Sequence, residues 1–475
     1  MAESSPLVAP IPAGTAVALH PSVRFFGDDL VAGGSPWRLL RLPGASRSVL
    51  ARWRRGDVVR PGEERLARTL ILQGLLVAPR APISDVDNVD VVIPVHNDAD
   101  ALGHLLDRLA DCHVTVVDDG SVDPRRLAAL AAAHGATLVR HDATRGPGAA
   151  RNSGLRATER PFVWFVDCDV ILDDALGVLG HLRSALEDPV VAASGPRVRG
   201  TPGASARERF EHSFGALDLG GEGGPVRPGG IVPYLPSACL LVRRDAMGDG
   251  FDPTLDVGED VDLVWRLVDR GWLVLYLPHV VVTHPARPTW TRWWRQRVAY
   301  GRSSGELARR HGDRLAPLRA DRWTLVTWAG LVARAPWLSA RTVATLRASV
   351  ERRLAASAED PRAVANALVA TTVLRAGGPL ARATTRTYGP LLWLAALHPR
   401  LRPRALAVLA VGTAWRFRGR RPQPSDVVLA VADDLAYAIG VAAGAWRART
   451  WRSLMPAVTA STVTWRDVLG ARERP

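Results

Sequence analysis

The sequence contains no lysine, so all 61 of its basic residues are arginines. Arginine and alanine are both used heavily, which is typical of a G+C-rich genome and does not by itself indicate a nucleic-acid-binding protein. The formal net charge of +14 nevertheless favours anionic partners, such as a sugar nucleotide or the acidic lipids of a cytoplasmic leaflet. Arginine suits such partners because its planar guanidinium group makes bidentate contacts with phosphate.

Cysteine is scarce, and no secretory signal is visible. The three cysteines, Cys112, Cys168 and Cys239, are far apart and form no CxxC pair, which argues against a zinc knuckle or a disulfide framework. We expect reduced thiols packed in a cytosolic core. Residues 1–14 alternate small, acidic and proline residues and do not place basic residues ahead of an apolar stretch, so secretion is not expected.

The chain also lacks the two commonest nucleotide-binding fingerprints. Its glycine-rich segment, residues 145–154, contains neither GxxxxGK[ST] nor GxGxxG, which argues against a P-loop and against a dinucleotide-binding motif. The segment leads into an expected helix at residues 148–157 that carries Arg151 and Asn152. An arginine at such a helix entry suits a phosphate, or the base and ribose of a nucleotide.

Composition and periodicity divide the 475 residues into four parts. Residues 1–18 are expected to be disordered. Residues 19–82 predict a small module with a short strand and three helices. The three helices are expected at 37–42, 48–53 and 64–76. Residues 88–315 predict an α/β domain, and residues 320–470 predict a helical region rich in tryptophan and arginine.

Strands and helices alternate through the α/β domain, which predicts a doubly wound, mostly parallel sheet. The strands are expected at 89–95, 114–117, 137–140, 162–172, 190–194, 235–242, 272–276 and 280–284. Segment 195–233, which is rich in glycine, proline and charge, predicts a loop over the site. Because ligands of such sheets bind at the carboxyl ends of the strands, the side chains that follow each strand are the candidates for function.

The most informative stretch is 162–172, where a buried apolar strand runs into Asp167 and Asp169. Two carboxylates separated by one residue at this end of a strand suit a divalent metal that carries a phosphate. An acidic turn without a ligand is the alternative. His284, at the end of the last expected strand, is a candidate third ligand, although a lone histidine is more often structural.

Two further strand ends carry candidate residues. The first strand is expected to end at Pro94, which stops the ladder, and Asn97 follows it. The second strand ends in Asp118 and Asp119, whose carboxylates can accept hydrogen bonds from ribose hydroxyls or from a pyrimidine N–H. Gly120 then permits a tight turn into the next helix.

A third candidate group opens a helix after Gly258, where Glu259, Asp260 and Asp262 follow one another closely. These carboxylates repel one another unless a ligand lies nearby, although acidic residues at a helix N-terminus are favourable in themselves. An ionised carboxylate at this place can act as a general base towards an acceptor hydroxyl, and Asp260 is the candidate.

In this order the motifs resemble those of the family 2 glycosyltransferases of GT-A fold, over about residues 89–288. The resemblance implies an inverting, metal-dependent hexosyltransferase in which Asp260, beside Glu259, deprotonates the acceptor. It implies Mg²⁺ or Mn²⁺ held by Asp167, Asp169 and His284. It also implies a sugar-nucleotide donor held by Pro94, Asn97, Asp118, Asp119, Arg151, Asn152 and Asp167.

The layout of the whole chain resembles the glycosyltransferases of mycofactocin systems, and the N-terminal module resembles winged-helix domains that recognise peptides. This implies UDP-glucose as donor, a peptide-derived redox cofactor precursor as acceptor, and repeated addition into a β-linked glucose chain. Two alternatives stay open, a polyprenyl-phosphate sugar transferase and a DNA-binding regulator that senses a nucleotide sugar. Asp167, Asp169 and Asp260 argue against the regulator, because a sensor needs no base.

The QxxRW motif of processive family members is missing, because Gln296 has no Arg-Trp pair at the required distance. This argues against long-chain processivity of the cellulose-synthase kind. Trp293, Trp294, Gln296 and Tyr300 are candidates for contact with the sugars of the acceptor. The alternative is that these aromatic rings pack in a core or at a membrane interface.

The helical region predicts contact with a membrane surface. Its apolar runs lie at 323–338, 391–397, 405–415 and 427–446. Only the last is long enough to span a bilayer, and it contains Asp433 and Asp434, which are costly in lipid. The flanking arginines and tryptophans favour in-plane contact with the cytoplasmic face of the cell membrane, and a soluble helical bundle is the alternative.

Overall fold

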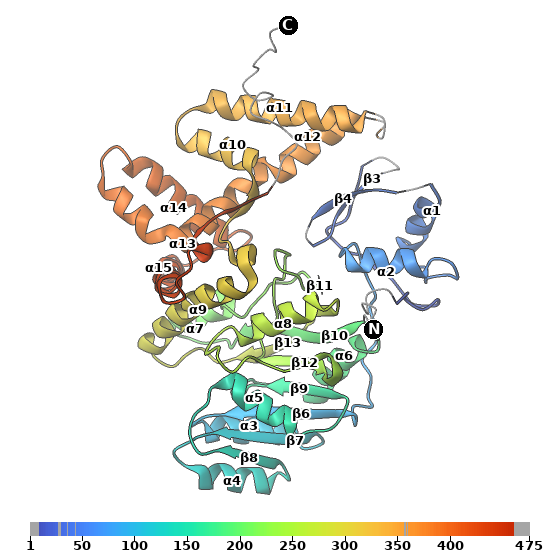
Figure 1. The fold of residues 1–475 in the computed structure, drawn as a ribbon, viewed down its shortest axis with the longest axis vertical. Coiled ribbons are helices and arrows are strands. Elements are labelled where there is room, and N and C mark those ends of the chain that lie inside the picture. Colours follow the sequence, from blue (N-terminus) through green and yellow to red (C-terminus); the bar gives the residue numbers. More distant parts are fainter. Residues whose placement is uncertain are drawn as a thin grey trace. The chain divides into compact units, whose positions relative to one another are not determined.

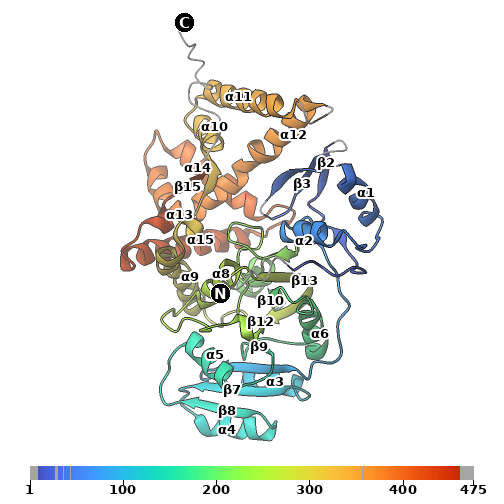
Figure 2. The same cartoon turned by 45° about the vertical axis from the view of Figure 1, so that its right-hand side comes forward.

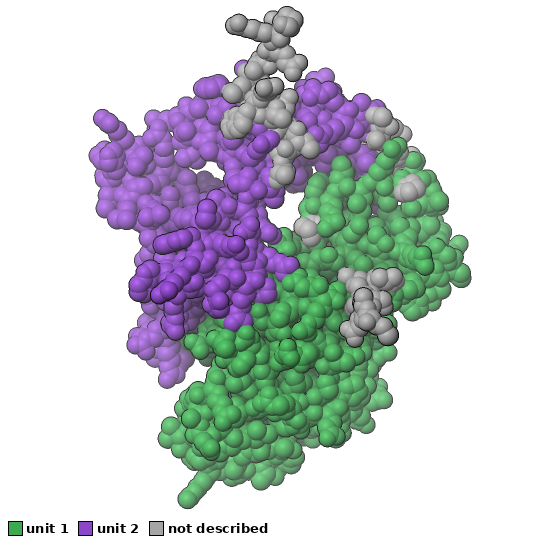
Figure 3. Space-filling view, in the orientation of Figure 1, with its two compact units in different colours: residues 1–24, 31–287 green, residues 25–30, 288–475 purple. Residues whose placement is uncertain are grey.

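The computed structural model describes residues 9–26, 30–35, 37–42, 44–355, 358 and 360–459. The chain forms two compact units, residues 1–24 with 31–287 (unit 1) and residues 25–30 with 288–475 (unit 2), which Figure 3 colours separately. Unit 1 contains a large β-sheet covered by helices, and unit 2 is mainly helical (Figure 1).

The first elements of the chain are short. They are β1 (Ala18–Leu19), β2 (Arg24–Phe26), β3 (Leu30–Gly33), β4 (Arg38–Arg41), α1 (Gly44–Trp53), α2 (Glu64–Leu72) and β5 (Leu76–Val77). The helix expected at 37–42 is wrong, because this segment is strand β4. The segment is short and ends at Leu42, directly before a proline. A residue that precedes a proline disfavours helical backbone angles. The winged-helix resemblance of this module stays a prediction.

Part of the expected disordered start, residues 1–8, lies outside the described residues. Further along, Ile11 and Val17 are buried in a core. Strand β1 pairs with β5 in antiparallel register, so the two ends of the module meet.

A buried ion pair joins this module to the rest of unit 1. Both terminal nitrogens of Arg68, on α2, donate to the carboxylate of Asp188 at 2.9 Å, and each side chain is only 4 % exposed. The Ser35 hydroxyl also accepts a hydrogen bond from the Ile231 N–H at 2.7 Å. The Arg68–Asp188 pair removes two charges from water. Each charge therefore depends on the other for compensation.

The large sheet has the predicted doubly wound character. Its strands are β6 (Val89–Val95), β7 (His113–Asp119), β8 (Thr137–His141), β9 (Phe162–Val166), β10 (Val191–Gly200), β11 (Gly224–Pro225), β12 (Cys239–Arg243) and β13 (Leu273–His284). The order is β11-β13-β10-β12-β9-β6-β7-β8. Strands β6 to β9 pair in parallel, as do β10 and β13, whereas β12 and β11 are antiparallel to their neighbours. The sheet is therefore mixed, and mostly parallel.

The helices of the sheet domain alternate with its strands. They are α3 (Ala99–Arg108), α4 (Pro124–Ala133), α5 (Pro147–Arg156), α6 (Ala175–Ala185), α7 (Ala206–Phe214) and α8 (Glu259–Asp269). Segment 195–233 is not only a loop, because it contains the end of β10, helix α7 and β11. A capping box formed by Ser205 and Glu208 starts α7, a local signal that the composition of the segment concealed.

Two details of the strands also differ from the expectation. The strand pair expected at 272–276 and 280–284 is the single strand β13, which follows β10 with a register irregularity beside Pro196 and Arg197. Strand β6 has the expected bounds of 89–95, but Pro94 does not stop its ladder, which pairs with β7 through Val95. Proline lacks an N–H but keeps its carbonyl acceptor, so one more residue of pairing is possible.

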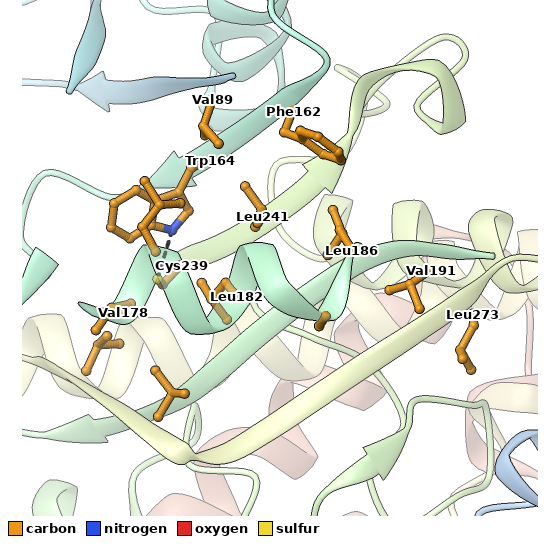
Figure 4. Close-up of a cluster of buried hydrophobic side chains, with 14 of the residues drawn as sticks. Val89, Phe162, Trp164, Val178, Leu182, Leu186, Val191, Cys239, Leu241 and Leu273 are labelled. Atoms are coloured by element: carbon orange, nitrogen blue, oxygen red, sulfur yellow. Dashed lines mark hydrogen bonds between the residues drawn. The ribbon is translucent and has the colours of Figure 1, made fainter. Parts of the chain in front are cut away.

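The sheet owes its stability to the apolar cluster around β9 (Figure 4). Every residue of β9 is buried. The Trp164 indole N–H donates to the Sγ atom of Cys239 at 3.3 Å, which satisfies the polar group of a fully buried ring. Burial raises the pKa of the Cys239 thiol to about 12, and all three cysteines are free, as expected for packed thiols.

Unit 2 consists mainly of helices, which Figures 1 and 2 show in yellow, orange and red. They are α9 (Trp290–His311), α10 (Arg322–Val332), α11 (Pro336–Leu354), α12 (Pro361–Thr372), α13 (Gly377–Leu397), α14 (Arg402–Arg416) and α15 (Pro424–Arg447). A short parallel pair, β14 (Arg319–Asp321) and β15 (Ala457–Thr459), lies beside them. Helix α13 kinks at Tyr388, just before Pro390.

Helices α9 and α15 approach closely through glycines. A Cβ atom on Gly301 of α9 would lie 2.1 Å from the Tyr437 carbonyl oxygen, and one on Gly444 of α15 would lie 2.2 Å from the Arg302 carbonyl oxygen. Both helices carry their glycines four residues apart, as Gly-x-x-x-Gly. Small residues at this spacing allow two helix backbones to touch.

The two aspartates inside the apolar helix α15 are paired with arginines of other helices. Asp433 accepts from the Arg297 Nε atom at 2.9 Å and lies 2.7 Å from Arg416, and Asp434 pairs with Arg382. Among the described helices, α15 alone is long and apolar enough to cross a membrane, and half of its apolar stretch is buried inside the protein. The ion pairs indicate an inner helix of unit 2 rather than a simple span.

Candidate active site

The predicted metal ligands come together at the carboxyl edge of the sheet in unit 1. Asp167 and Asp169 follow β9, and His284 ends β13. One ligand atom from each lies within 4.8 Å of the other two. The His284 Nε2 atom is 3.1 Å from an Asp169 carboxylate oxygen, so the histidine and the aspartate are already in contact.

A backbone bridge explains why residues so distant in sequence meet. The Ile171 N–H donates to the Thr283 carbonyl at 2.8 Å, and the Thr283 N–H returns a bond to Ile171 at 3.3 Å. This bridge lays the turn that carries Asp169 against the last residues of β13. His284 is the next residue on that strand and therefore reaches the aspartates.

The charges of this trio stabilise one another. Burial alone would raise the pKa of Asp169, but the His284 hydrogen bond and the charges of His284 and Arg287 outweigh burial and lower it. Burial alone would lower the pKa of the His284 imidazole. Its hydrogen bond to Asp169 and the Asp169 charge outweigh burial and raise that pKa. Arg287, whose guanidinium is 3.3 Å from Asp169, was not predicted from the sequence. Its position three residues after His284 was the only available signal.

This donor set fits a divalent cation. Two carboxylates and one imidazole are ligands that Mn²⁺ accepts readily, and the carboxylates suit Mg²⁺ as well. Three protein ligands leave coordination positions for diphosphate oxygens or water. Asp167 and Asp169 remain partly exposed, at 28 % and 17 % of their side-chain surface, so a ligand can reach them.

The predicted base lies next to the metal-binding turn. Helix α8 begins after Gly258, whose φ of 91° is in the left-handed region that favours glycine. An Asp260 carboxylate oxygen accepts from the Ser237 N–H at 3.3 Å, and the carbonyl of the next residue, Ala238, accepts from the Asp167 N–H at 2.9 Å. One short segment before β12 therefore contacts Asp260 and Asp167, the predicted base and a predicted metal ligand.

Asp260 has the electrostatic character of a general base. Burial and the neighbouring charge of Glu259 raise its pKa to about 7, against the lowering effect of the Val261 and Ser237 N–H groups and of Arg151. A carboxylate with a pKa near neutrality accepts a proton more readily than an exposed aspartate does, yet remains substantially ionised at neutral pH.

Arg151 links the two halves of the site. One terminal nitrogen donates to Asp167 at 2.6 Å and the other to Glu259 at 2.7 Å, and the guanidinium lies over the Phe251 ring. Burial would lower the pKa of Arg151, but Asp167 and Glu259 raise it further, so the group stays charged. Arg151 therefore holds the metal-binding turn and the start of α8 in a fixed relation.

The residues predicted to hold the nucleoside are engaged with protein atoms. Asp118 is fully buried, accepts from the Ser121 N–H at 2.9 Å and pairs with Arg140. Asp119 accepts from His141 at 2.7 Å and from two N–H groups at the start of the glycine-rich segment. These contacts hold the loops that follow β7 and β8, and direct contact of either aspartate with a nucleoside stays a prediction.

Arg140 and His141 were missed by sequence reasoning. They lie at the carboxyl end of β8, and His141 spans from Asp119 to the Ser153 hydroxyl at 2.9 Å. The rule that ligands bind at the carboxyl ends of the strands pointed to residues at the ends of β6, β7 and β9. Applied to β8, it would have pointed to Arg140 and His141 as well.

The two predicted asparagines clamp loops. Asn152 donates to the Phe251 carbonyl at 2.7 Å and accepts from its N–H at 2.8 Å. Asn97, in left-handed backbone conformation, accepts from the Val122 N–H at 2.8 Å. Both asparagines therefore position loops that border the site. Contact of either asparagine with the sugar-nucleotide donor stays a prediction.

The residues predicted for acceptor sugars belong to α9 of unit 2. Trp293 is 2 % exposed and lies under Arg297, which leaves little of its ring accessible to a sugar. Trp294, Gln296 and Tyr300 are partly exposed, and the Gln296 amide donates to the Tyr300 hydroxyl at 3.0 Å. Acceptor contact stays a prediction for all four residues.

Comparison with known proteins identifies the family of this chain. The model of glycosyl transferase family 2 matches residues 90–251. The chain is 36 % identical over 471 residues to the Pre-mycofactocin glycosyltransferase of Mycobacterium tuberculosis, covering 94 % of this chain and 98 % of that protein. It is 30 % identical over 199 residues to the succinoglycan biosynthesis protein ExoU of Rhizobium meliloti, covering 39 % of this chain and 58 % of that protein.

Among solved structures, the mannosyltransferase PcManGT of Pyrobaculum calidifontis, in complex with GDP-Man and Mn²⁺, is 20 % identical with a TM-score of 0.38. The similarity covers 72 % of this chain and 90 % of that one. The mixed sheet and its flanking helices have the predicted GT-A fold, and the family match assigns the chain to the glycosyltransferases. The chain belongs to glycosyl transferase family 2 and, within it, to the glycosyltransferases of mycofactocin systems.

Proposed function

We propose that this protein transfers glucose from UDP-glucose, with inversion, to a peptide-derived redox cofactor precursor, premycofactocin. The reaction type is supported by Asp260, a carboxylate with a pKa of about 7 held beside the metal-ligand trio. The acceptor is supported by similarity over 98 % of the length of a relative named for it. UDP-glucose is proposed from the resemblance of the whole chain.

The residues divide the chemistry between them. The Asp260 carboxylate takes the proton of an acceptor hydroxyl while that oxygen bonds to the anomeric carbon of the donor. The bond from this carbon to the diphosphate oxygen breaks, and its electron pair leaves with UDP. Attack from the opposite face converts an α-linked donor into a β-linked product.

The remaining groups stabilise charge and position the reactants. Mg²⁺ or Mn²⁺, when held by Asp167, Asp169 and His284, supplies positive charge for the departing diphosphate. Arg151 keeps Asp167 and Glu259 in place through its two charge-assisted bonds. We propose that the reaction repeats to build a short β-linked glucose chain at the cytoplasmic face of the cell membrane.

Mass spectrometry tests the proposal directly. The purified full chain is incubated with UDP-glucose, Mg²⁺ or Mn²⁺ and premycofactocin, beside a polyprenyl phosphate control. We expect successive additions of one hexose to premycofactocin, and no product after chelation of the metal. Asp167→Asn is expected to lose activity, whereas Asp173→Asn, an exposed aspartate nearby, is expected to keep it.

Two results would change the proposal in different ways. Hexose on the polyprenyl phosphate alone would keep the glycosyltransferase and overturn the acceptor. Undiminished transfer in the presence of a chelator would overturn the role of the metal trio.

A further inference from the structure

The hairpin of α13 and α14 in unit 2 exposes an apolar surface at its turn. The two helices lie side by side in Figures 1 and 2. Leu391, Leu394 and Leu397 are 63 %, 62 % and 73 % exposed, and their spacing of three residues places them on one side of α13. Trp393 and Leu401 add further exposed apolar surface at the same end. We call residues 391–406 the α13–α14 tip.

Large apolar side chains rarely gather on a surface that meets only water. The tip is continuous in sequence, and each of its exposed leucines lies within a helix or in the short turn that joins α13 to α14. A partner that covers it must therefore accept an apolar ridge built from one helical hairpin.

Positive charge surrounds this ridge. Arg400, Arg402 and Arg404 lie in the turn and in the first turn of α14, and hydrogen bonds to backbone carbonyls hold Arg402 and Arg404 in place. No aspartate or glutamate occurs from residue 361 to residue 425, whereas arginine occurs eleven times there. Three of these arginines, Arg382, Arg386 and Arg416, pair with Asp433 or Asp434 of α15. The tip itself, residues 391–406, contains three arginines and no acidic residue, so it is cationic.

Two partners could cover an apolar ridge of this kind, a second copy of the chain or a lipid surface. The charge of the tip distinguishes between them. A second copy of the chain would bring another cationic tip towards the first, and the arginines would repel one another. An anionic lipid surface offers phosphates for the arginines and an acyl boundary for the leucines. Helix α15 is a weaker candidate for this contact, because half of its apolar stretch is already buried.

We propose that the α13–α14 tip is the surface through which this protein binds an anionic membrane. Leu391, Leu394 and Leu397 enter the boundary between headgroups and acyl chains. Arg400, Arg402 and Arg404 contact lipid phosphates around them. This inference deepens the proposed membrane location and does not depend on the proposed reaction.

Vesicle flotation of the full chain tests this surface. The probes are vesicles of phosphatidylcholine alone and of phosphatidylcholine mixed with phosphatidylglycerol. We expect binding to the mixed vesicles and much weaker binding to the neutral ones. Substituting Arg400, Arg402 and Arg404 together by glutamine should weaken binding roughly 100-fold, since each arginine near an anionic surface contributes a factor of about five.

Matched variants exclude a general effect of charge or polarity. Exposed arginines elsewhere in the chain serve for the charge control, which is the triple variant Arg55→Gln, Arg108→Gln, Arg125→Gln. The apolar test is Leu394→Gln with Leu397→Gln, and its control is Leu176→Gln, an exposed leucine of α6. Both tip variants should lose vesicle binding, whereas both controls should keep it. Circular dichroism confirms that each variant is folded.

Three outcomes would overturn the proposal. They are failure of the unchanged protein to bind anionic vesicles, retention of binding by both tip variants, and dimerisation through the tip in solution without vesicle binding. Hexose transfer to soluble premycofactocin, measured without vesicles, is expected to be equal in the tip variants and the unchanged protein. A failure of the proposed reaction is therefore distinguishable from a failure of the membrane surface.

Discussion

The Asp260 carboxylate occupies a position that favours its neutral form, because burial and the charge of Glu259 both raise its pKa. This pKa suits the proposed role of Asp260, because a general base works best with a pKa near the working pH. Its contacts with the Ser237 N–H and its closeness to Arg151 limit how far the pKa rises.

Replacing Asp260 by asparagine removes the proton acceptor and keeps the shape of the side chain. We expect transfer to fall roughly 100- to 10,000-fold, the usual contribution of a general base. Calorimetric binding of UDP and Mn²⁺ should stay nearly unchanged, and Asp256→Asn, an exposed neighbour, should keep its activity. Weak donor binding with normal chemistry would instead place Asp260 in the donor site.

The same pKa predicts a pH dependence. Below pH 7 Asp260 binds a proton and can no longer accept one, so kcat/KM should fall with decreasing pH and level off above about pH 7. The groups that face it are Glu259 on its own helix, Arg151 from α5 and the Ser237 N–H. A kcat/KM profile that stays flat from pH 5.5 to 8.5 (roughly the range that brackets this pKa) would contradict the assignment.

The free energy of unfolding should depend on pH in the opposite sense to kcat/KM and should fall as pH rises. The folded protein holds the Asp260 proton up to about pH 7, whereas the unfolded chain releases it near pH 4. Asp260 therefore costs the folded state stability as pH rises between these values. Thermal unfolding at pH 8 should show Asp260→Asn to be more stable than the unchanged protein, and this difference should shrink as the pH is lowered towards 4.

At the scale of elements, the α9 and α15 contact depends on the absence of side chains. Gly444→Ala would place a Cβ atom 2.2 Å from the Arg302 carbonyl oxygen, and neither backbone can move without separating the helices. We expect the free energy of unfolding of unit 2 to fall by roughly 1–3 kcal/mol. Circular dichroism on heating measures it.

A helical glycine with room for a methyl group is the control. In Gly103→Ala the nearest atom, on Leu130, lies 3.5 Å from the new Cβ, which is ordinary contact. Alanine is a better helix former than glycine by about 1 kcal/mol, so this variant should be unchanged or slightly stabilised. Equal effects of the two substitutions would show that the α9 and α15 backbones are further apart than described.

At the scale of the whole molecule, the Arg68 and Asp188 pair fixes the N-terminal module within unit 1. Asp188→Asn leaves the buried Arg68 guanidinium without its counter-ion, which costs about 3–5 kcal/mol. We expect faster hydrogen exchange in α2 and a lower unfolding temperature. Asp100→Asn, which breaks an exposed pair with Arg126, should change stability by less than about 1 kcal/mol.

If Asp188→Asn exchanges amide hydrogens in α2 as slowly as the unchanged protein, the module is held by other contacts. Its bonds from His20 to Gly223 and from Ile231 to Ser35 would then be the next to examine.

Much of the sheet domain was predictable because its signals are local. Buried β-branched runs mark β6, β7 and β9, and the helices between them force the strands to run parallel, so Asp119 and Asp167 had to share one edge. The predictions failed where a short segment has two possible structures. Residues 37–42 fit a helix or a strand by periodicity alone, and pairing with the nearby strand β3 in the three-stranded sheet β2-β3-β4 decides between them.

The sequence by itself determined the fold class, the edge of the sheet where function lies and the carboxylates placed there, since alternating strands and helices admit few topologies. Only the tertiary structure decided their partners. The Ile171 and Thr283 bridge brings His284 to Asp169, and Arg151 reaches Glu259 across 108 positions of the chain. Such contacts depend on how packed elements meet, to within fractions of an ångström, which no local pattern of residues encodes.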